Sequence, residues 1–99
     1  MGEERYSGGD VYTGQFVNGV RMGNGMMRYS NGAVYSGQWW QGYQEGNGQE
    51  RYANGSVYLG QFSVAKRHGL GTLSHSNGAK QTGHWDQGNF VCEEESKGE

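Results

Sequence analysis

The 99-residue chain contains no proline, no isoleucine, only three leucines and a single cysteine, Cys92. One cysteine cannot form an internal disulfide framework, so a reducing compartment, the cytoplasm, is the expected location. No apolar run approaches the ~20 residues that a membrane-spanning helix needs. The scarcity of aliphatic side chains also argues against a conventional core of Leu, Ile and Val between two layers.

A strong positive charge is missing as well. The formal net charge is −2, whereas a domain that binds nucleic acid is expected to be basic or to carry a basic patch, so nucleic acid is not an expected partner. Glycine and aromatic residues are abundant instead, with 20 glycines and 13% Phe, Trp and Tyr. Apolar burial must therefore come from aromatic rings, each of which buries a large area.

These two residue types recur with a period of 23 residues, which indicates a repeat protein. Five columns hold 17 of the 20 glycines: Gly14, Gly37, Gly60 and Gly83; Gly9, Gly32, Gly55 and Gly78; Gly23, Gly46 and Gly69; Gly25, Gly48 and Gly71; Gly19, Gly42 and Gly88. Three aromatic columns keep the same register: Tyr12, Tyr35 and Tyr58; Phe16, Trp39, Phe62 and Trp85; Tyr6, Tyr29 and Tyr52, with His75 in the fourth place. The unit occurs about four times.

Each unit predicts two short strands, such as 11–17 and 24–30, joined by Gly-bearing turns. The expected fold is all-β, an elongated single-layer antiparallel meander of about eight strands and roughly 40 Å. Residues two apart share a face, so Tyr35, Gly37 and Trp39 lie together. We favour a connection with an odd number of residues at 31–32, a type I turn closed by a left-handed glycine, which places Gly25 on that same face. The rings would then lie on bare glycine backbone, and the other face, with Gln15, Gln38 and Gln61, would be wet.

The pattern Tyr-x-Gly-x-Trp/Phe, then Asn-Gly, then Gly-x-Gly resembles the MORN repeat (membrane occupation and recognition nexus). The resemblance covers 11–32, 34–55, 57–78 and, in part, 80–90. Two departures stand out. Val64-Ala65 replaces the usual Asn-Gly, which suggests a reshaped turn. Gln81 replaces Tyr in the last unit, whose second strand is expected to be missing, as at a truncated or capping end.

The resemblance implies a binding and scaffolding module without catalysis, of the kind found at membrane contacts, beside phosphatidylinositol-phosphate kinase domains and in cytoskeletal proteins. The partners it implies are peptide or helical segments and, as the alternative, anionic phospholipids such as phosphoinositides. We divide the chain into an N-terminal tail (1–5), the array (6–90, with units at 11–33, 34–56, 57–79 and a partial 80–90) and an acidic tail (91–99). Unpaired sheet edges predict pairing between two copies of the chain.

The expected partner-binding residues form a contiguous aromatic row with one exposed ring face, which marks interaction sites. The competing interpretation is that these rings cover one another and form only the core. The expected residues are Tyr12, Phe16, Tyr29, Tyr35, Trp39, Tyr52, Tyr58, Phe62 and Trp85, together with Trp40 and Tyr43, which depart from the other units. The alternative, lipid binding, would use Arg5, Arg28 and Arg51 on the polar face, about 10 Å apart, with Lys66 and Arg67 of a basic turn at 66–69. The competing interpretation of these cations is a solvated surface.

Metal binding and catalysis are not expected. His68, His75, His84 and Cys92 lack the paired spacing of a zinc site, and His75 and His84 should face opposite ways. The glycine pairs of 23–28 and 46–51 are not followed by the Lys-Ser/Thr of a phosphate-binding loop. No spacing suggests a nucleophile with its base, so no cofactor is expected either.

Overall fold

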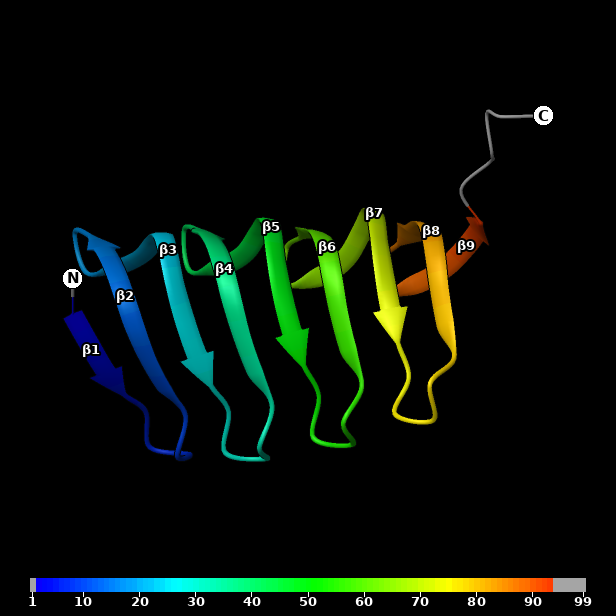
Figure 1. Ribbon diagram of the computed structural model, residues 1–99. Coiled ribbons are helices and arrows are strands. Elements are labelled where there is room, and N and C mark those ends of the chain that lie inside the picture. The colour runs from blue at the N-terminus through cyan, green and yellow to red at the C-terminus, as the bar shows by residue number, and fades with distance from the viewer. Residues whose placement is uncertain (1, 94–99) are drawn as a thin grey trace.

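Nine antiparallel strands, each hydrogen-bonded to its neighbours in sequence, form one open sheet across residues 2–93, which are the residues that the computed structural model describes. The strands are β1 (Gly2–Arg5), β2 (Val11–Val17), β3 (Val20–Arg28), β4 (Val34–Trp40), β5 (Tyr43–Arg51), β6 (Val57–Ser63), β7 (Lys66–Ser74), β8 (Lys80–Asp86) and β9 (Asn89–Glu93). The molecule is 49 Å long, with β1 and β9 at opposite ends (Figure 1). The predicted all-β meander is confirmed.

The two ends of the sheet differ from the prediction. Segment 2–5, expected as a tail, forms β1 and pairs with β2 from Gly2 opposite Gly14 to Arg5 opposite Val11. The last unit has the second strand that was expected to be missing, because β9 pairs with β8. Backbone pairing does not require the consensus side chains, so incomplete units still extend the sheet. Of the expected acidic tail, residues 91–93 belong to β9, and 94–99 lie outside the described residues.

The strands are joined by two kinds of connection, which lie along opposite edges of the sheet (Figure 1). Five-residue loops such as 29–33 connect each unit to the next, with Arg28 opposite Val34. In that loop the Gly32 amide donates to the Tyr29 carbonyl at 3.0 Å, and Gly32 has a φ of 97°. The odd loop closed by a left-handed glycine is therefore confirmed, and it puts Gly25 and Trp39 on one face.

Two-residue turns at 18–19, 41–42, 64–65 and 87–88 close the hairpins within units. Both turn residues have positive φ, as a type I′ turn requires. The turn at Val64-Ala65 keeps this form, with φ of 48° and 69°, so the expected reshaping does not occur. The Ala65 amide donates to the Gln44 carbonyl at 2.9 Å, as the Gly42 amide does to the Arg21 carbonyl at 3.0 Å, and this contact holds the turn in place.

A bulge interrupts each of the first three hairpins at the same point. In the first, Gly14 pairs with Gly25 and Phe16 with Arg21, so three residues of β3 oppose one residue of β2. Gly23 takes a φ of 78° at the bulge. Bulges bend a strand, and the strand ends above them curve behind the sheet (Figure 1). The sheet is therefore folded over its own aromatic face, rather than flat.

Tyrosine rings lie on glycine backbone inside this fold. A row of glycines crosses the first eight strands in register, running Gly2, Gly14, Gly25, Gly37, Gly48, Gly60, Gly71 and Gly83. A Cβ added to Gly48 would lie 2.6 Å from the Cε1 and Cζ atoms of Tyr35, so only glycine leaves room for the ring. The Tyr35 hydroxyl donates to the Gln38 carbonyl at 2.8 Å, which satisfies its buried polar atom.

The core is a continuous chain of aromatic rings along the sheet. Successive rings meet edge to face with centroids 5.0–5.5 Å apart, in the order Phe16, Tyr12, Trp39, Tyr35, Phe62, Tyr58, Trp85 and Phe90. This geometry suits the ring quadrupole and adds to the gain from area burial. It replaces the second layer that a single sheet would otherwise need.

Candidate interaction surfaces

Arginine side chains cover the ring core on its inner side. The Arg21 guanidinium lies 5.0 Å from the Trp39 ring, and its Nη2 donates to the Gly42 carbonyl at 2.7 Å. Two units later, Arg67 lies 4.8 Å from the Trp85 ring and donates to the Gly88 carbonyl at 2.7 Å. Each cation thus ties a hairpin turn to the ring core through a cation–π contact and a charge-assisted hydrogen bond.

The second unit breaks this arrangement. Gln44 occupies the position that corresponds to Arg21 and Arg67. Phe62 occupies the position of the tryptophans, Trp39 and Trp85, that contact these arginines. The Gln44 side chain is 4% exposed, and its Nε2 donates to the Tyr29 hydroxyl at 2.6 Å. Of these three equivalent inner positions, the first and third thus hold a guanidinium and the second an uncharged amide.

A hollow opens at this middle position. Its lining includes Tyr29, Ala33, Glu50 and Tyr52, and its volume is about 420 Å³. Glu50 is half-buried, and burial raises the pKa of its carboxyl, an effect that nearby Arg67 partly offsets. Burial, reinforced by the Glu50 charge, raises the pKa of Tyr29 and of Tyr52 to about 12. Both tyrosines are thus neutral at physiological pH.

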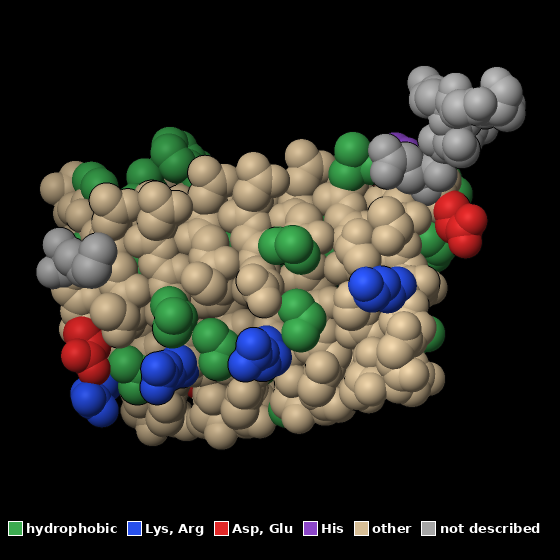
Figure 2. Space-filling view, in the orientation of Figure 1, with side chains coloured by type: hydrophobic (Ala, Val, Ile, Leu, Met, Phe, Trp, Pro, Cys, Tyr) green, Lys and Arg blue, Asp and Glu red, His purple; other side chains and the backbone are tan. Residues whose placement is uncertain are grey.

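Apolar side chains are exposed at the turns of the first two hairpins. Trp40 and Tyr43 pair across their turn, and each is 54% exposed. Val17 and Val20 occupy the same places on the preceding hairpin and are 52% and 40% exposed. A hollow of about 500 Å³ joins the two hairpins, because Val17 and Trp40 both line it, with Met22. We call Val17, Val20, Trp40 and Tyr43 the hairpin-tip patch; hydrophobic side chains show at this edge in Figure 2.

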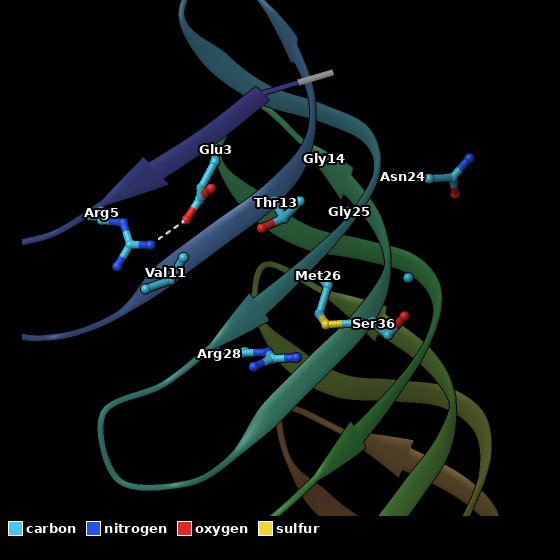
Figure 3. Close-up of a pocket in the computed structure, with 11 residues that line it drawn as sticks. Glu3, Arg5, Val11, Thr13, Gly14, Asn24, Gly25, Met26, Arg28 and Ser36 are labelled. Atoms are coloured by element: carbon cyan, nitrogen blue, oxygen red, sulfur yellow. Dashed lines mark ion pairs between the residues drawn. The ribbon is translucent and has the colours of Figure 1, made fainter.

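Basic side chains form a row on the outer face of the sheet. Cross-strand pairing aligns Arg5, Val11, Arg28, Val34, Arg51, Val57, Ser74 and Lys80. Cations and hydrophobic side chains alternate along this face in Figure 2. Arg5 pairs with Glu3 at 3.0 Å, at one side of a shallow hollow of about 650 Å³ that extends to Met26 and Arg28 (Figure 3). Within residues 2–93 no carboxylate lies within 4 Å of Arg28 or Arg51.

Comparison with known families decides what kind of chain this is. The sequence model of the MORN repeat matches three consecutive 23-residue stretches, 12–34, 35–57 and 58–80. The chain belongs to the MORN-repeat family. No curated protein matches it. MORN repeats are generally protein- or membrane-interaction modules, and the matched stretches coincide with the repeating hairpins of the sheet.

The MORN fold buries most of the rings predicted to bind a partner. Tyr12, Tyr35 and Tyr58 have no exposed surface, and Trp39, Phe62 and Trp85 are each 4% exposed. The expected row of exposed ring faces is therefore wrong for these six, because the bulges fold the strand ends over them. Phe16, Tyr29 and Tyr52 are partly buried, and Trp40 and Tyr43 are well exposed.

The predicted lipid-binding cations do not form one group. Arg5, Arg28 and Arg51 share the outer face, as expected. Residues 66–69 are not a turn but the start of β7. Consecutive residues of a strand face opposite ways, so Lys66 is exposed while Arg67 turns inward to the Tyr58 and Trp85 rings. Lys80 completes the outer row instead.

The glutamine column of the MORN units has a role that the sequence analysis missed. The Gln15 Oε1 atom accepts the Asn24 amide at 2.7 Å beside the bulge, and Gln38 and Gln61 repeat the contact at 2.8 and 2.7 Å. The side chain thus satisfies a backbone donor next to the bulge. The recurrence of glutamine every 23 residues is the sequence feature that indicates this role, although such a column is equally typical of a solvent-exposed face.

The remaining candidates gather no site within residues 2–93. The His75 ring bonds to Gln81 on the inner side at 3.0 Å, whereas His84 is exposed on the outer face, and His68 pairs with Asp86 at 3.4 Å. In this part of the chain no three His, Cys, Asp or Glu side chains cluster so that they could hold a metal ion. The same residues contain no helix that could cross a membrane.

Proposed function

We propose that this MORN array is a non-catalytic, cytoplasmic scaffold that binds a peptide or helical segment of a partner protein through the hairpin-tip patch. The observation that carries the proposal is the 54% exposure of both Trp40 and Tyr43 in a chain whose other tryptophans are 4% exposed. Large aromatic side chains dominate the binding energy of interfaces. A contiguous exposed apolar patch is the feature that marks an interaction site.

The buried rings support this role indirectly. The chain of edge-to-face contacts links each hairpin to the next, and we expect it to keep the hairpins in fixed positions relative to one another. A rigid scaffold lowers the ordering cost of binding. Partly buried Phe16, Tyr29 and Tyr52 extend the surface available to a partner on the inner side.

A pull-down from the native cell with the double variant Trp40→Ala/Tyr43→Ala tests the proposal. The side chains are exposed, so the variant should fold normally while it loses the partner. Leu59→Ala is the matched control, because Leu59 is 60% exposed on the outer face, away from the patch. A partner that the double variant retains at wild-type level would contradict the proposal.

A second candidate is association with anionic membranes, which the outer row favours. Arg28, Arg51 and Lys80 lie there in one row with half-buried Val34 and Val57, so one face offers both phosphate-binding and apolar groups. Sedimentation with vesicles containing phosphoinositides checks this candidate. Salt-sensitive binding that Arg28→Glu/Arg51→Glu abolishes would favour it over the hairpin-tip patch, whereas absence of binding at low salt would remove it.

Pairing between copies of the chain is also proposed, because β1 and β9 each have a neighbour on one side only within the described sheet. Exposed strand edges are templates for further pairing. Light scattering across a concentration series should then show dimers at the higher concentrations. A mass that stays monomeric throughout would remove this proposal.

A further inference from the structure

The second MORN unit places a carboxylate in the apolar row of the sheet. Glu50 lies directly opposite Tyr35 on one side and Tyr58 on the other. The residues 23 positions away on either side, Met27 and Leu73, are 4% and 8% exposed and belong to the core. A half-buried carboxylate at such a position costs stability, and departures of this kind concentrate at functional sites.

Glu50 forms no salt bridge with the described part of the chain. Among residues 2–93 no basic nitrogen lies within 4 Å of Glu50. Arg67 acts on it from further away, because its guanidinium is held by the Gly88 carbonyl and the Trp85 ring. A ligand cation that reaches Glu50 would therefore not have to displace a salt bridge.

Two tyrosine rings stand on either side of the same hollow. Tyr29 and Tyr52 belong to successive loops two strands apart, a separation of roughly 10 Å. An ammonium group between them would come within the ~6 Å at which aromatic rings attract cations. The Tyr52 ring already has a guanidinium 5.7 Å from its centroid, and a hydrogen bond from Gln44 fixes the Tyr29 hydroxyl.

The corresponding positions of the neighbouring units lack this combination. Between Tyr6 and Tyr29 the repeat supplies Asp10 and Met27 in place of Ala33 and Glu50. In the third unit the same columns hold Tyr52, Ser56, Leu73 and His75. Two tyrosines, a small apolar side chain and a carboxylate thus occur together in the middle hollow, which has a volume of about 420 Å³.

We propose that this hollow binds the ammonium group of a lysine side chain from a partner polypeptide. Glu50 supplies the opposite charge, Tyr29 and Tyr52 supply the aromatic walls, and Ala33 leaves room for the aliphatic stem. The site lies apart from the hairpin-tip patch and does not depend on it. It gives the array a second, charge-selective contact on the inner side.

NMR titration of the whole chain with lysine blocked at both ends (Nα-acetyl, N-methylamide) tests the proposal at constant ionic strength. A single side chain should bind weakly, with a Kd on the order of 10 mM, and should shift the resonances of Ala33, Glu50 and Tyr52 in a saturable manner. Glu50→Gln should weaken binding at least fivefold. Glu4→Gln is the matched control, because Glu4 occupies the same column at the exposed edge strand and should leave binding unchanged.

Several outcomes would contradict lysine binding in this hollow. Shifts of equal size with the norleucine analogue, which lacks the charge, would overturn the proposal, as would wild-type binding by Glu50→Gln or no saturable shift in the folded wild-type chain. Binding to phosphatidylcholine vesicles that Glu50→Gln abolishes would assign the hollow to a choline headgroup instead of a lysine. Trp40→Ala/Tyr43→Ala should leave the titration unchanged, so failure of the hairpin-tip proposal and failure of this one are distinguishable.

Discussion

The turn at Val64-Ala65 should be the least favourable backbone of the array, and replacing it with the sequence of the first hairpin should stabilise the protein. The φ values of 48° and 69° lie in the left-handed region, which β-branched residues in particular avoid. The first hairpin meets the same requirement with Asn18-Gly19, at φ of 52° and 79°. The perturbation is therefore Val64→Asn/Ala65→Gly.

The structure suggests that little else changes. Val64 is 56% exposed, so Asn loses little burial. The Ala65 amide bonds to the Gln44 carbonyl at 2.9 Å, and glycine retains that donor. Left-handed backbone costs roughly 1–2 kcal/mol per residue, and the exchange relieves part of this cost. Against this gain, glycine raises the conformational entropy of the unfolded chain, which lowers the free energy of unfolding by about 0.4–1 kcal/mol. The net gain should be about 1–2 kcal/mol, which raises the Tm by roughly 5–10 °C in a domain of this size.

Urea unfolding followed by tryptophan fluorescence, together with thermal scans, measures this gain. The reciprocal variant Asn18→Val/Gly19→Ala is the matched control and should lose a similar free energy. A Cβ on Gly19 would meet no atom within 4 Å, so that loss would come from the backbone alone. Equal stability of wild type and Val64→Asn/Ala65→Gly, with a clear loss in the reciprocal variant, would refute the reasoning.

Three further changes test the core, the inner cations and the buried carboxylate. Gly25→Ala should cost about 2–3 kcal/mol in urea unfolding, because its Cβ would overlap a buried tyrosine ring, whereas Gly8→Ala, with open space around it, should be neutral. Arg21→Ala should cost about 1–2 kcal/mol through its lost carbonyl and ring contacts, and the exposed Arg28→Ala should change stability by less than about 0.5 kcal/mol. Burial raises the pKa of the Glu50 carboxyl in the folded chain, so the unfolded chain loses this proton at lower pH and the ionised carboxylate destabilises the fold. Glu50→Gln should therefore raise the free energy of unfolding at pH 7 and leave it unchanged at pH 3. An equal effect at both pH values would contradict this.

The register of the sheet could be predicted because the glycine columns and the aromatic columns must both be matched across neighbouring strands. Each tyrosine ring needs glycine on the neighbouring strand. The 23-residue repeat places glycine there on the same face only if the connecting loop has an odd number of residues. The structure agrees, with Gly25 directly opposite Gly37. The Trp39 Nε1 atom donates to the Gly25 carbonyl at 3.1 Å, which places the largest and smallest residues in contact.

The bend of the strands could not be predicted from the alternation of side chains along a strand, because that pattern assumes a strand without a bulge. The sequence shows Gly23 only as a member of a glycine column, yet its left-handed conformation helps to form the bulge that folds the upper strand ends over the rings. This fold decides which aromatic residues are accessible. It also reverses the sequence-based view of Arg67, which became a core-covering residue rather than a surface cation.

The second unit departs from the repeat in several side chains, and these departures converge on two places. Gln44 removes a cation from the inner side, and Glu50 adds a carboxylate beside it, so a cation from another molecule could take the vacated role. Trp40 and Tyr43 place two aromatic side chains at the tip of the same hairpin, whereas the next hairpin has Ser63 and Lys66 there. The backbone of that hairpin is the same as that of its neighbours, with the same bulge and turn, so folding alone does not require these exchanges. A scaffold that keeps one backbone and varies the side chains of one unit can present partner-specific groups at fixed positions, and in this chain those groups are the hairpin-tip patch and the inner hollow.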